Sequence, residues 1–291
     1  MEGYQSAACW DGFRSKDASA RAGLGRGWVL DKSGPAAGQW RYRSLNERPA
    51  MSMTGNRVLL VGGTSGLGLA VARAVAERGA QPIVASRRQA SVDRAVSSLP
   101  AGAAGYTVDI ASEDSLAQLV STAGAVDHLV YTAGEALQLT HLADLTPEVI
   151  RRFWETRYIG AISVVRALVI AGALKEGGSI VLTGGNAGQR PAPGWALGAS
   201  ICGAMEALTR ELALELAPIR VNLVAPGVTR TPLWGSMTEE EESTMYASLA
   251  SQLPVGRVGE PDDIALAYVY AMQQPMATGT SITVDGGAVL V

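Results

Sequence analysis

Residues 57–68 read Arg-Val-Leu-Leu-Val-Gly-Gly-Thr-Ser-Gly-Leu-Gly. The apolar run 58–61 is followed by glycine and predicts a short strand that is buried on both faces. Leu67 and Val71 then begin the spacing of a helix. A glycine turn between a strand and a helix lets a phosphate chain approach the backbone, where the free N–H groups and dipole of the helix attract it. This context predicts a dinucleotide site at Gly62, Thr64, Ser65, Gly66, Leu67 and Gly68.

The rest of the chain beyond residue 52 repeats this alternation of short apolar runs and helical periods. Strands are predicted at 58–61, 81–86, 105–108, 128–131, 179–183, 220–225 and 281–284. Helices are predicted at 67–75, 90–99, 112–120, 147–173, 198–216, 238–252 and 261–273. Strands that alternate with helices of this length indicate βαβ units. We expect an α/β fold, a Rossmann-type doubly wound parallel sheet of about seven strands with helices on both faces.

Residues 1–52 differ from this pattern. They contain Trp10, Trp28 and Trp40 but show neither helical nor strand periodicity. We expect a disordered extension, or translation from an upstream start with the real start at Met51 or Met53. Residues 53–291 are then one dinucleotide-binding catalytic domain.

Composition limits the class of protein. The 291 residues are 47% hydrophobic and carry a net charge of −3, which argues against nucleic acid or an anionic membrane as partner. No apolar run reaches the roughly 18 residues of a membrane helix. Cys9 and Cys202 are too few for a disulfide framework or a metal site. We expect a cytoplasmic protein that acts on a small molecule and holds no metal.

The second predicted strand ends with Ser86, Arg87 and Arg88. In a dinucleotide fold this end faces the adenosine ribose, where an acidic residue binds the 2′-hydroxyl of NAD. No acidic residue stands here, and an arginine can pair with a 2′-phosphate. Arg87 therefore favours NADP(H) over NAD(H); the alternative is a solvated arginine at a strand end.

Together these segments resemble the short-chain dehydrogenase/reductase family from about residue 54 onward. The third strand is followed by Asp109 and Ile110, where the family has an aspartate that contacts adenine. Tyr-Thr-Ala-Gly at 131–134 stands where the family has Asn-Asn-Ala-Gly, and Val-Asp-Gly-Gly at 284–287 is typical of the family's end. The resemblance implies further cofactor contacts at Ala133 and Gly134, and contacts with the nicotinamide at Pro226, Gly227, Thr229 and Thr231.

The same resemblance shows four departures. The family's working residues are an asparagine, a serine, a tyrosine and a lysine, and the segment 204–210 sets the alignment. On that register Arg157 stands for the asparagine and Gly185 for the serine, while Gly198 and Cys202 replace the Tyr-x3-Lys pair. Neither lysine nor tyrosine occurs anywhere from 176 to 245, so no local shift of the alignment restores the pair.

Three side chains are candidates to replace the lost chemistry. Arg157 is a permanent cation that can stabilise an oxyanion or clamp a carboxylate; the alternative is a structural salt bridge. Tyr158 can supply a hydroxyl, although core packing is the competing interpretation. Cys202 can bring a thiol to the site or serve as a small buried packing residue.

The segment 183–195 is expected to line the substrate region. Asn186 belongs to it, Trp195 is a candidate aromatic wall, and Arg190 is a candidate anchor for an anion. Loop rigidity and surface charge are the alternatives for Arg190 and Trp195. Residues 231–259 match the variable lid of the family, and Glu239–Glu242 there favour a solvated helix start.

Three functions remain open on the sequence. The first is an NADP(H)-dependent oxidoreductase that transfers a hydride to or from a small carbonyl, alcohol or activated double bond. The second is a non-redox enzyme of the lyase or cyclase type on the same fold, and the third is an inactive NADP(H)-binding protein. The resemblance also implies a homo-dimer or homo-tetramer assembled through the helices at 147–173 and 198–216.

Overall fold

The computed structural model describes residues 29–30, 40–41, 52–137, 139–235 and 237–291. The chain divides into two units, 1–49 and 50–291. In the first unit the described residues are two short strands, β1 (Val29–Leu30) and β2 (Trp40–Arg41), which pair antiparallel. Otherwise the extension expected at 1–52 lies almost entirely outside the described residues. All of the candidate site residues belong to the second unit.

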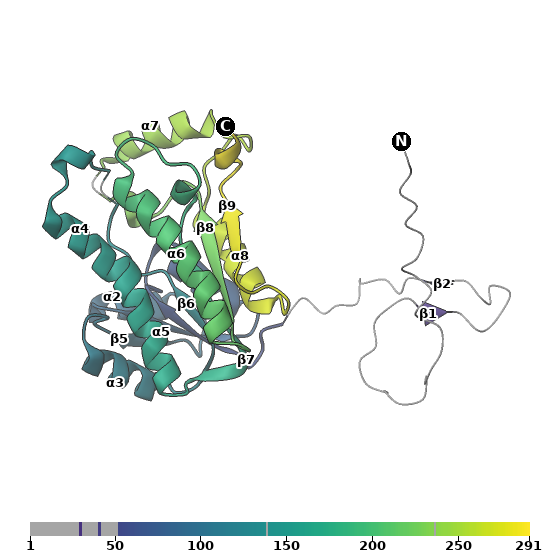
Figure 1. Cartoon of the computed structure of the whole chain (residues 1–291). Coiled ribbons are helices and arrows are strands. Elements are labelled where there is room, and N and C mark those ends of the chain that lie inside the picture. Colours follow the sequence, from purple (N-terminus) through teal and green to yellow (C-terminus); the bar gives the residue numbers. More distant parts are fainter. Residues whose placement is uncertain (1–28, 31–39, 42–51, 138, 236) are drawn as a thin grey trace, which may run out of the picture. The chain divides into compact units, whose positions relative to one another are not determined.

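The second unit is built on a seven-stranded sheet in which every neighbouring pair is parallel, as Figure 1 shows. Its strand order is β5-β4-β3-β6-β7-β8-β9, so the chain runs outward from β3 to one edge and then to the other. The strands are β3 (Arg57–Val61), β4 (Gln81–Ser86), β5 (Ala104–Thr107), β6 (Val126–Tyr131), β7 (Leu174–Thr183), β8 (Arg220–Pro226) and β9 (Ser281–Val284). The predicted Rossmann-type fold is confirmed.

Helices cover both faces of this sheet because its strands are apolar on both sides. Leu59 and Val61 of β3 pack with α3, α4, α5 and α6, whereas Val58 and Leu60 pack with α1, α2 and α8. The bounds are α1 (Gly66–Ala76), α2 (Gln89–Ser97), α3 (Glu113–Ala123), α4 (Pro147–Trp154), α5 (Gly160–Ile170), α6 (Ala196–Glu215) and α8 (Pro261–Gln273). The sheet is thus the middle of three layers, and its core lies on both of its faces.

The helix predicted at 147–173 differs from the structure in two respects. It is helical from α4 to α5, but a π-helical turn, η3 (Glu155–Ile159), separates these two α-helices. It also ends at Ile170, because Gly172 takes a φ of +58° and turns the chain into β7. The strand β7 accordingly begins at Leu174, five residues earlier than predicted.

A small third cluster covers the carboxyl end of the sheet. Trp234 in the short turn η5 (Pro232–Trp234) packs with Tyr246 of α7 (Glu239–Ala250) and with Val258. Thr238 caps α7 in a capping box with Glu241, which explains the acidic run as a helix start. Figure 1 shows α7 above the end of the sheet, near the C-terminus. No helix among the described residues is long and apolar enough to cross a membrane.

Candidate functional site

The carboxyl ends of β6, β7 and β8 open into one cavity of about 120 Å³. In doubly wound sheets, ligands bind at this edge, where the strand order reverses. The cavity runs from the segments predicted to hold the nicotinamide to a wall of large apolar side chains. Its lining includes Tyr131, Thr132, Ala133, Leu137, Phe153, Arg157, Gly185, Asn186, Trp195, Gly198, Cys202, Gly227 and Trp234.

The glycine turn after β3 leaves no space for side chains. Gly62 has a φ of +92°, and a Cβ there would lie 2.5 Å from the backbone nitrogen of Ala133. A Cβ on Gly68 would lie 2.5 Å from the Oγ1 of Thr132. The turn therefore packs directly on the segment that follows β6, and only glycine permits this approach.

The helix α1 begins at this turn. Ser65 precedes it, its side chain exposed and making no capping hydrogen bond, and the first turn of α1 holds no acidic residue. On the other side of the turn, Gly66 lies against Thr231 and Pro232, which would stand 3.5 Å from a Cβ. Free N–H groups and the positive end of the helix dipole thus face a space bounded by the two predicted cofactor segments.

The predicted adenosine contacts lie along the ends of β4 and β5. Ser86 ends β4, and Arg87 and Arg88 follow it with exposed side chains. Neither arginine has an ion-pair partner among the described residues. Asp109 follows β5 with its carboxylate exposed, where Oδ1 accepts a hydrogen bond from the Ala111 backbone N–H at 3.1 Å. Ile110 beside it reaches Gly160 at the start of α5.

The segment after β8 is held in place by local hydrogen bonds. Pro226 and Gly227 line the cavity, and Gly227 packs on Asp285 so closely that a Cβ would lie 2.7 Å from that residue's Cα. The Oγ1 of Thr229 donates to the carbonyl of Gly227 at 3.0 Å. Thr231 caps η5 by accepting a hydrogen bond from the backbone N–H of Leu233 at 3.4 Å.

Gly185, Gly198 and Cys202 all line the cavity. A Cβ on Gly185 would lie 3.1 Å from the Cys202 sulfur. A Cβ on Gly198 would lie 3.0 Å from the indole ring of Trp195. The space that side chains at 185 and 198 would enter is thus bounded by the ends of two other side chains.

The weakly acidic groups in the cavity wall hold their protons tightly. Burial raises the pKa of the Cys202 thiol to about 11. Burial also raises the pKa of Tyr131, whose hydroxyl donates to the carbonyl oxygen of Thr156. Neither group is suited to donate a proton at neutral pH.

Arg157 is brought into the cavity from the π-helical turn η3. Its Nη2 donates to the carbonyl oxygen of Glu135 at 2.5 Å, and its Cζ lies 4.6 Å from the centre of the Phe153 ring. It has no ion-pair partner among the described residues, so the predicted alternative of a structural salt bridge is not formed in this structure. Burial lowers the pKa of Arg157, and the charge of Glu135 opposes that shift.

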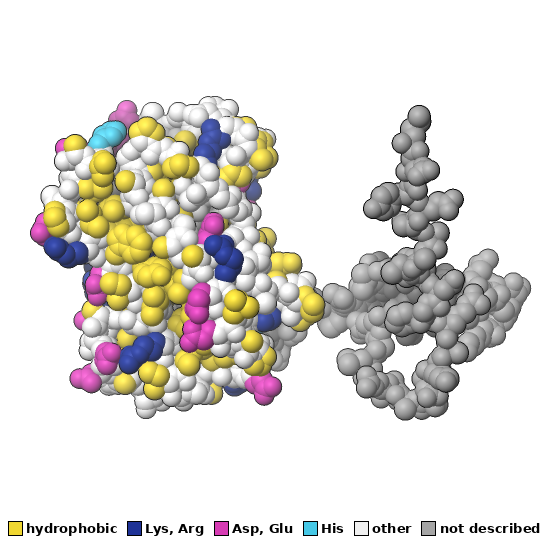
Figure 2. Space-filling model, viewed as in Figure 1, with side chains coloured by type: hydrophobic (Ala, Val, Ile, Leu, Met, Phe, Trp, Pro, Cys, Tyr) yellow, Lys and Arg dark blue, Asp and Glu magenta, His cyan; other side chains and the backbone are white. Residues whose placement is uncertain are grey.

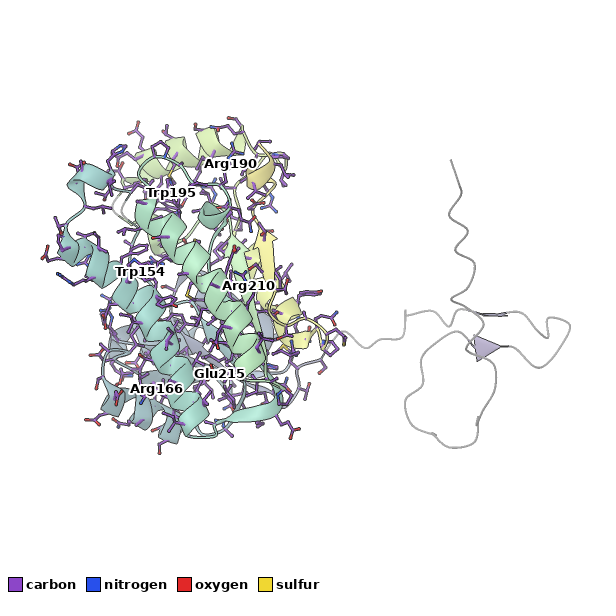
Figure 3. The ribbon with its side chains drawn as sticks, viewed as in Figure 1. Trp154, Arg166, Arg190, Trp195, Arg210 and Glu215 are labelled. Atoms are coloured by element: carbon purple, nitrogen blue, oxygen red, sulfur yellow. The ribbon has the colours of Figure 1, made fainter. Side chains whose placement is uncertain are left out.

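The structure does not bring two of the predicted residues into the cavity. The ring of Tyr158 packs edge-on against Trp154, 5.3 Å between centres, and both partly buried rings lie against the edge of the core. The Nη1 of Arg190 donates to the carbonyl of Ala288 at 2.7 Å, and Figure 3 shows this side chain near the C-terminal turn η6 (Ala288–Leu290). Asn186 does line the cavity and donates to Asp285 at 3.3 Å.

Trp195 lies just before α6, at the cavity wall (Figure 3). Its ring meets that of Trp234 edge-on, 6.3 Å between centres. Sequence reasoning missed Trp234, and it also missed Phe153 and Leu137. Phe153 stands one helical turn before Arg157, a spacing that could have revealed it; the pairing of Trp234 with Trp195 across 39 positions left no local signal.

Comparison with known proteins gives concordant results. The family model described as enoyl-(acyl carrier protein) reductase matches residues 61–289. The short-chain dehydrogenase/reductase ATR9 of Stachybotrys chlorohalonatus is 34% identical over 252 residues, which are 82% of this chain and 99% of that protein.

Two solved structures extend the comparison. A small-chain dehydrogenase in complex with NADPH is 34% identical, with a TM-score of 0.70, over 81% of this chain and 99% of that one. The MalC reductase/Diels-Alderase of Malbranchea aurantiaca is 30% identical, with a TM-score of 0.76, over 82% of this chain and 98% of that one. The chain therefore belongs to the short-chain dehydrogenase/reductase family of oxidoreductases.

Proposed function

We propose that this protein is an NADP(H)-dependent reductase that delivers a hydride to a small, conjugated organic acceptor. The observation that carries the proposal is one cavity with two contrasting ends. A close-packed glycine turn stands at the cofactor end. The other end is lined by Gly185, Gly198 and Cys202, which the sequence aligns with the family's Ser-Tyr-Lys positions. When bound, the nicotinamide would supply the hydride.

The described residues fit such a cofactor. The glycines at 62 and 68 leave a cradle that a Cβ would fill, and α1 presents its N-terminus without an acidic side chain nearby. We assign the pyrophosphate to residues 62–68, the adenine to Asp109 and Ile110, and the nicotinamide to the segments at 133–134 and 226–231. The solved NADPH complex of a relative that is 34% identical supports this assignment.

The nature of the acceptor follows from the missing proton donor. Hydride addition to a plain ketone creates an alkoxide, and general acid catalysis there is worth about 10²–10⁴-fold. The titratable groups that line this cavity are a thiol with a pKa of about 11, a tyrosine whose pKa is raised, and a permanently charged arginine. An acceptor that delocalises or neutralises the incoming electron pair, such as an enone, a quinone or an imine, does not depend on that acid.

The first test is a calorimetric titration of NADPH and NADH into the full chain. We expect NADPH to bind more tightly because Arg87 is free to pair with its 2′-phosphate. Arg87→Ala should lower the NADPH/NADH affinity ratio about 10- to 100-fold, the range of a charge-assisted hydrogen bond. Arg94→Ala, on an exposed position of α2, is the matched control and should leave the ratio unchanged. An unaltered ratio in Arg87→Ala contradicts the assignment.

The second test follows NADPH absorbance with a panel of enones, quinones, imines and plain ketones. We expect oxidation of NADPH with at least one conjugated acceptor and little with the ketones. Oxidation by none of the acceptors, in a protein that binds NADPH, would favour the inactive binding protein instead.

A second candidate function has its own support. The 30% identical MalC structure is described as a reductase and a Diels-Alderase, and the cavity here is walled by Trp195, Trp234, Leu137 and Phe153. A cavity of this kind can also hold a substrate in a reactive shape for a cyclisation without redox change. Turnover of a substrate by protein freed of cofactor would support this function over the reductase.

We also propose that the chain forms a homo-dimer or homo-tetramer through α4, α5 and α6. Figure 2 shows apolar side chains gathered on the face that these helices present. Ile159, Ile162, Val169 and Ile170, which lie in η3 and α5, are exposed, and Leu214 of α6 is 83% exposed. Sedimentation velocity should show a species of at least twice the monomer mass, and a monomer at micromolar concentration would contradict the proposal.

A further inference from the structure

Arg157 stands at an unusual place in the helical layer. It lies inside the π-helical turn η3, between α4 and α5, where one extra residue widens the helix. Such turns occur frequently at functional sites, because the wider turn re-aims the side chains within it. Here Arg157 and Phe153 both line the cavity, whereas the neighbouring Tyr158 packs in the core.

The guanidinium is fixed by three contacts. One amino group donates to the carbonyl of Glu135, and the plane lies over the Phe153 ring. The third contact is with Gly134, where a Cβ would come within 2.5 Å of Nη1. These contacts hold the position of the charge. The Glu135 carboxylate is near enough to raise the pKa of Arg157, but it forms no ion pair with the guanidinium.

The Nε of Arg157 remains without a partner. It is one of two buried side-chain polar atoms without a hydrogen bond in the described part of the chain, and the other is Oε2 of Glu135. An unsatisfied buried donor is costly, so the side chain is held here at the expense of a hydrogen bond. The Nε itself is closed off from the cavity, but the Arg157 side chain lines it, so the remaining N–H groups of the guanidinium are the ones that can donate to a bound acceptor.

We propose that Arg157 holds the oxygen of the substrate, and that the substrate is therefore an α,β-unsaturated carbonyl or quinone-type compound. This inference rests on the proposed hydride transfer. The β-carbon of the acceptor takes the hydride, the π pair of its C=C bond moves to form an enolate, and the enolate oxygen accepts the Arg157 N–H. Water then protonates the α-carbon and completes the two-electron reduction.

The charge of Arg157 decides between the acceptors that the cavity allows. An enolate gains negative charge during hydride transfer, and a fixed cation in a partly dry cavity stabilises it more than it stabilises the neutral substrate. An iminium ion is already positive and is repelled by the same cation. The substrate class is thus narrowed to acceptors that become anionic on oxygen.

A phenolate tests this site without any redox step. We would titrate para-nitrophenol into the full chain saturated with NADP+ and follow the phenolate absorbance against pH. The wild type should lower the pKa of the bound phenol by at least about one unit, a tenfold preference for the anion. An unchanged or raised pKa of the bound phenol overturns the inference, and this measurement needs no variant.

Variants locate the effect. Arg157→Met should abolish the preference for phenolate and slow enone reduction about 10²–10³-fold, as for loss of an oxyanion donor. Arg152→Met, an exposed arginine of α4, is the control and should retain both properties. Arg157→Lys keeps the positive charge but lacks the two-pronged guanidinium. Its phenolate preference and its rate of enone reduction should lie between those of Arg157→Met and wild type. Phenolate binding that is equal in Arg157→Met and wild type overturns the inference.

Three further outcomes separate the proposals. Phenolate binding that depends on Arg157, without NADPH oxidation by any acceptor, supports the oxyanion site and contradicts the reductase. Reduction of imines by a protein that shows no preference for phenolate supports the reductase and overturns the oxyanion site. Weaker NADP+ binding by Arg157→Met, with phenolate binding intact, makes Arg157 a cofactor contact and likewise overturns the inference.

Discussion

Glycine serves opposite purposes at two places along the same edge of the sheet. At Gly62 an added Cβ would meet the backbone of residues 132 and 133, which cannot move without the sheet. At Gly185 and Gly198 the nearest atoms are the ends of two side chains, the Cys202 sulfur and the Trp195 ring. The first region excludes side chains because of the fold. In the second region, substitutions can place other side chains in the space. The catalytic chemistry can therefore change there while the cofactor end stays the same.

The largest effect on activity is expected when the family's catalytic side chains are introduced into that space. The variant Arg157→Asn, Gly185→Ser, Gly198→Tyr and Cys202→Lys, combined with Trp195→Ala to free the room beside residue 198, should reduce a plain ketone. We expect a rate about 10²–10⁴-fold above wild type, the usual gain from general acid catalysis. NADPH oxidation in the presence of a simple ketone measures it.

The matched control differs from this variant only by one hydroxyl group. Gly198→Phe in place of Gly198→Tyr gives the same bulk without a hydroxyl and should remain as slow as wild type. Calorimetry must show that both variants still bind NADPH. A wild type that already reduces the ketone as fast as the refilled variant would show that the four positions do not limit this chemistry.

The next effect probes the close-packed region. Gly62→Ala should lower the free energy of unfolding by about 2–5 kcal/mol. Two costs add up: alanine is strained at a positive φ, and its Cβ overlaps the backbone of Ala133. Chemical denaturation measures the stability, and NADPH titration should show weaker binding in the same variant.

Two other glycines separate the causes. Gly102 has a φ of +99° with nothing within 4 Å of a Cβ, so Gly102→Ala reports the backbone strain alone, about 1–2 kcal/mol. Gly185 has an extended backbone, so Gly185→Ala should change stability little. Equal losses at 62 and 102 would mean that the contact with Ala133 adds nothing, and the contrast between the two regions would disappear.

Much of the fold could be predicted because its signals are local. The run 58–61 is apolar at every position, and its neighbours in the sheet repeat that pattern with glycine at their ends. Each such apolar run predicts a strand that is buried on both faces. Because helices connect the successive strands, the strands are expected to pair in parallel. The glycine turn was predicted for the same reason, since strand, turn and helix are consecutive.

The unpredicted features depend on contacts between distant segments. The spacing of apolar residues at 155–159 does not distinguish the π-helical turn from an α-helix. Yet in this turn Arg157 lines the cavity, whereas Tyr158 packs against the core. Trp234 meets Trp195 although 39 positions separate the two residues in the chain, so no local pattern predicts the contact. Arg190 was a reasonable candidate by charge, but its partner is a backbone carbonyl near the end of the chain.

The smallest effect concerns Cys202, which fills part of the exchangeable space. Because burial raises the pKa of this thiol to about 11, the folded protein keeps the proton that the unfolded chain releases near pH 9. The contribution of the thiol to stability is therefore complete below about pH 9 and is lost as the pH rises towards 11. We expect a loss of about 1–3 kcal/mol over this window.

The difference between wild type and variant isolates this effect from other groups that titrate in alkali. The free energy of unfolding of Cys202→Ala, subtracted from that of wild type at each pH, should remove the tyrosine and lysine contributions common to both. Cys202→Ser, with a hydroxyl that does not titrate in the window, should give the same pH profile as Cys202→Ala. A wild-type curve parallel to both variants from pH 8 to 11 would mean that the thiol is not held in a dry environment. The space beside Gly185 would then be open to water, and the argument that the Cys202 thiol is too weak an acid to serve this cavity would lose its basis.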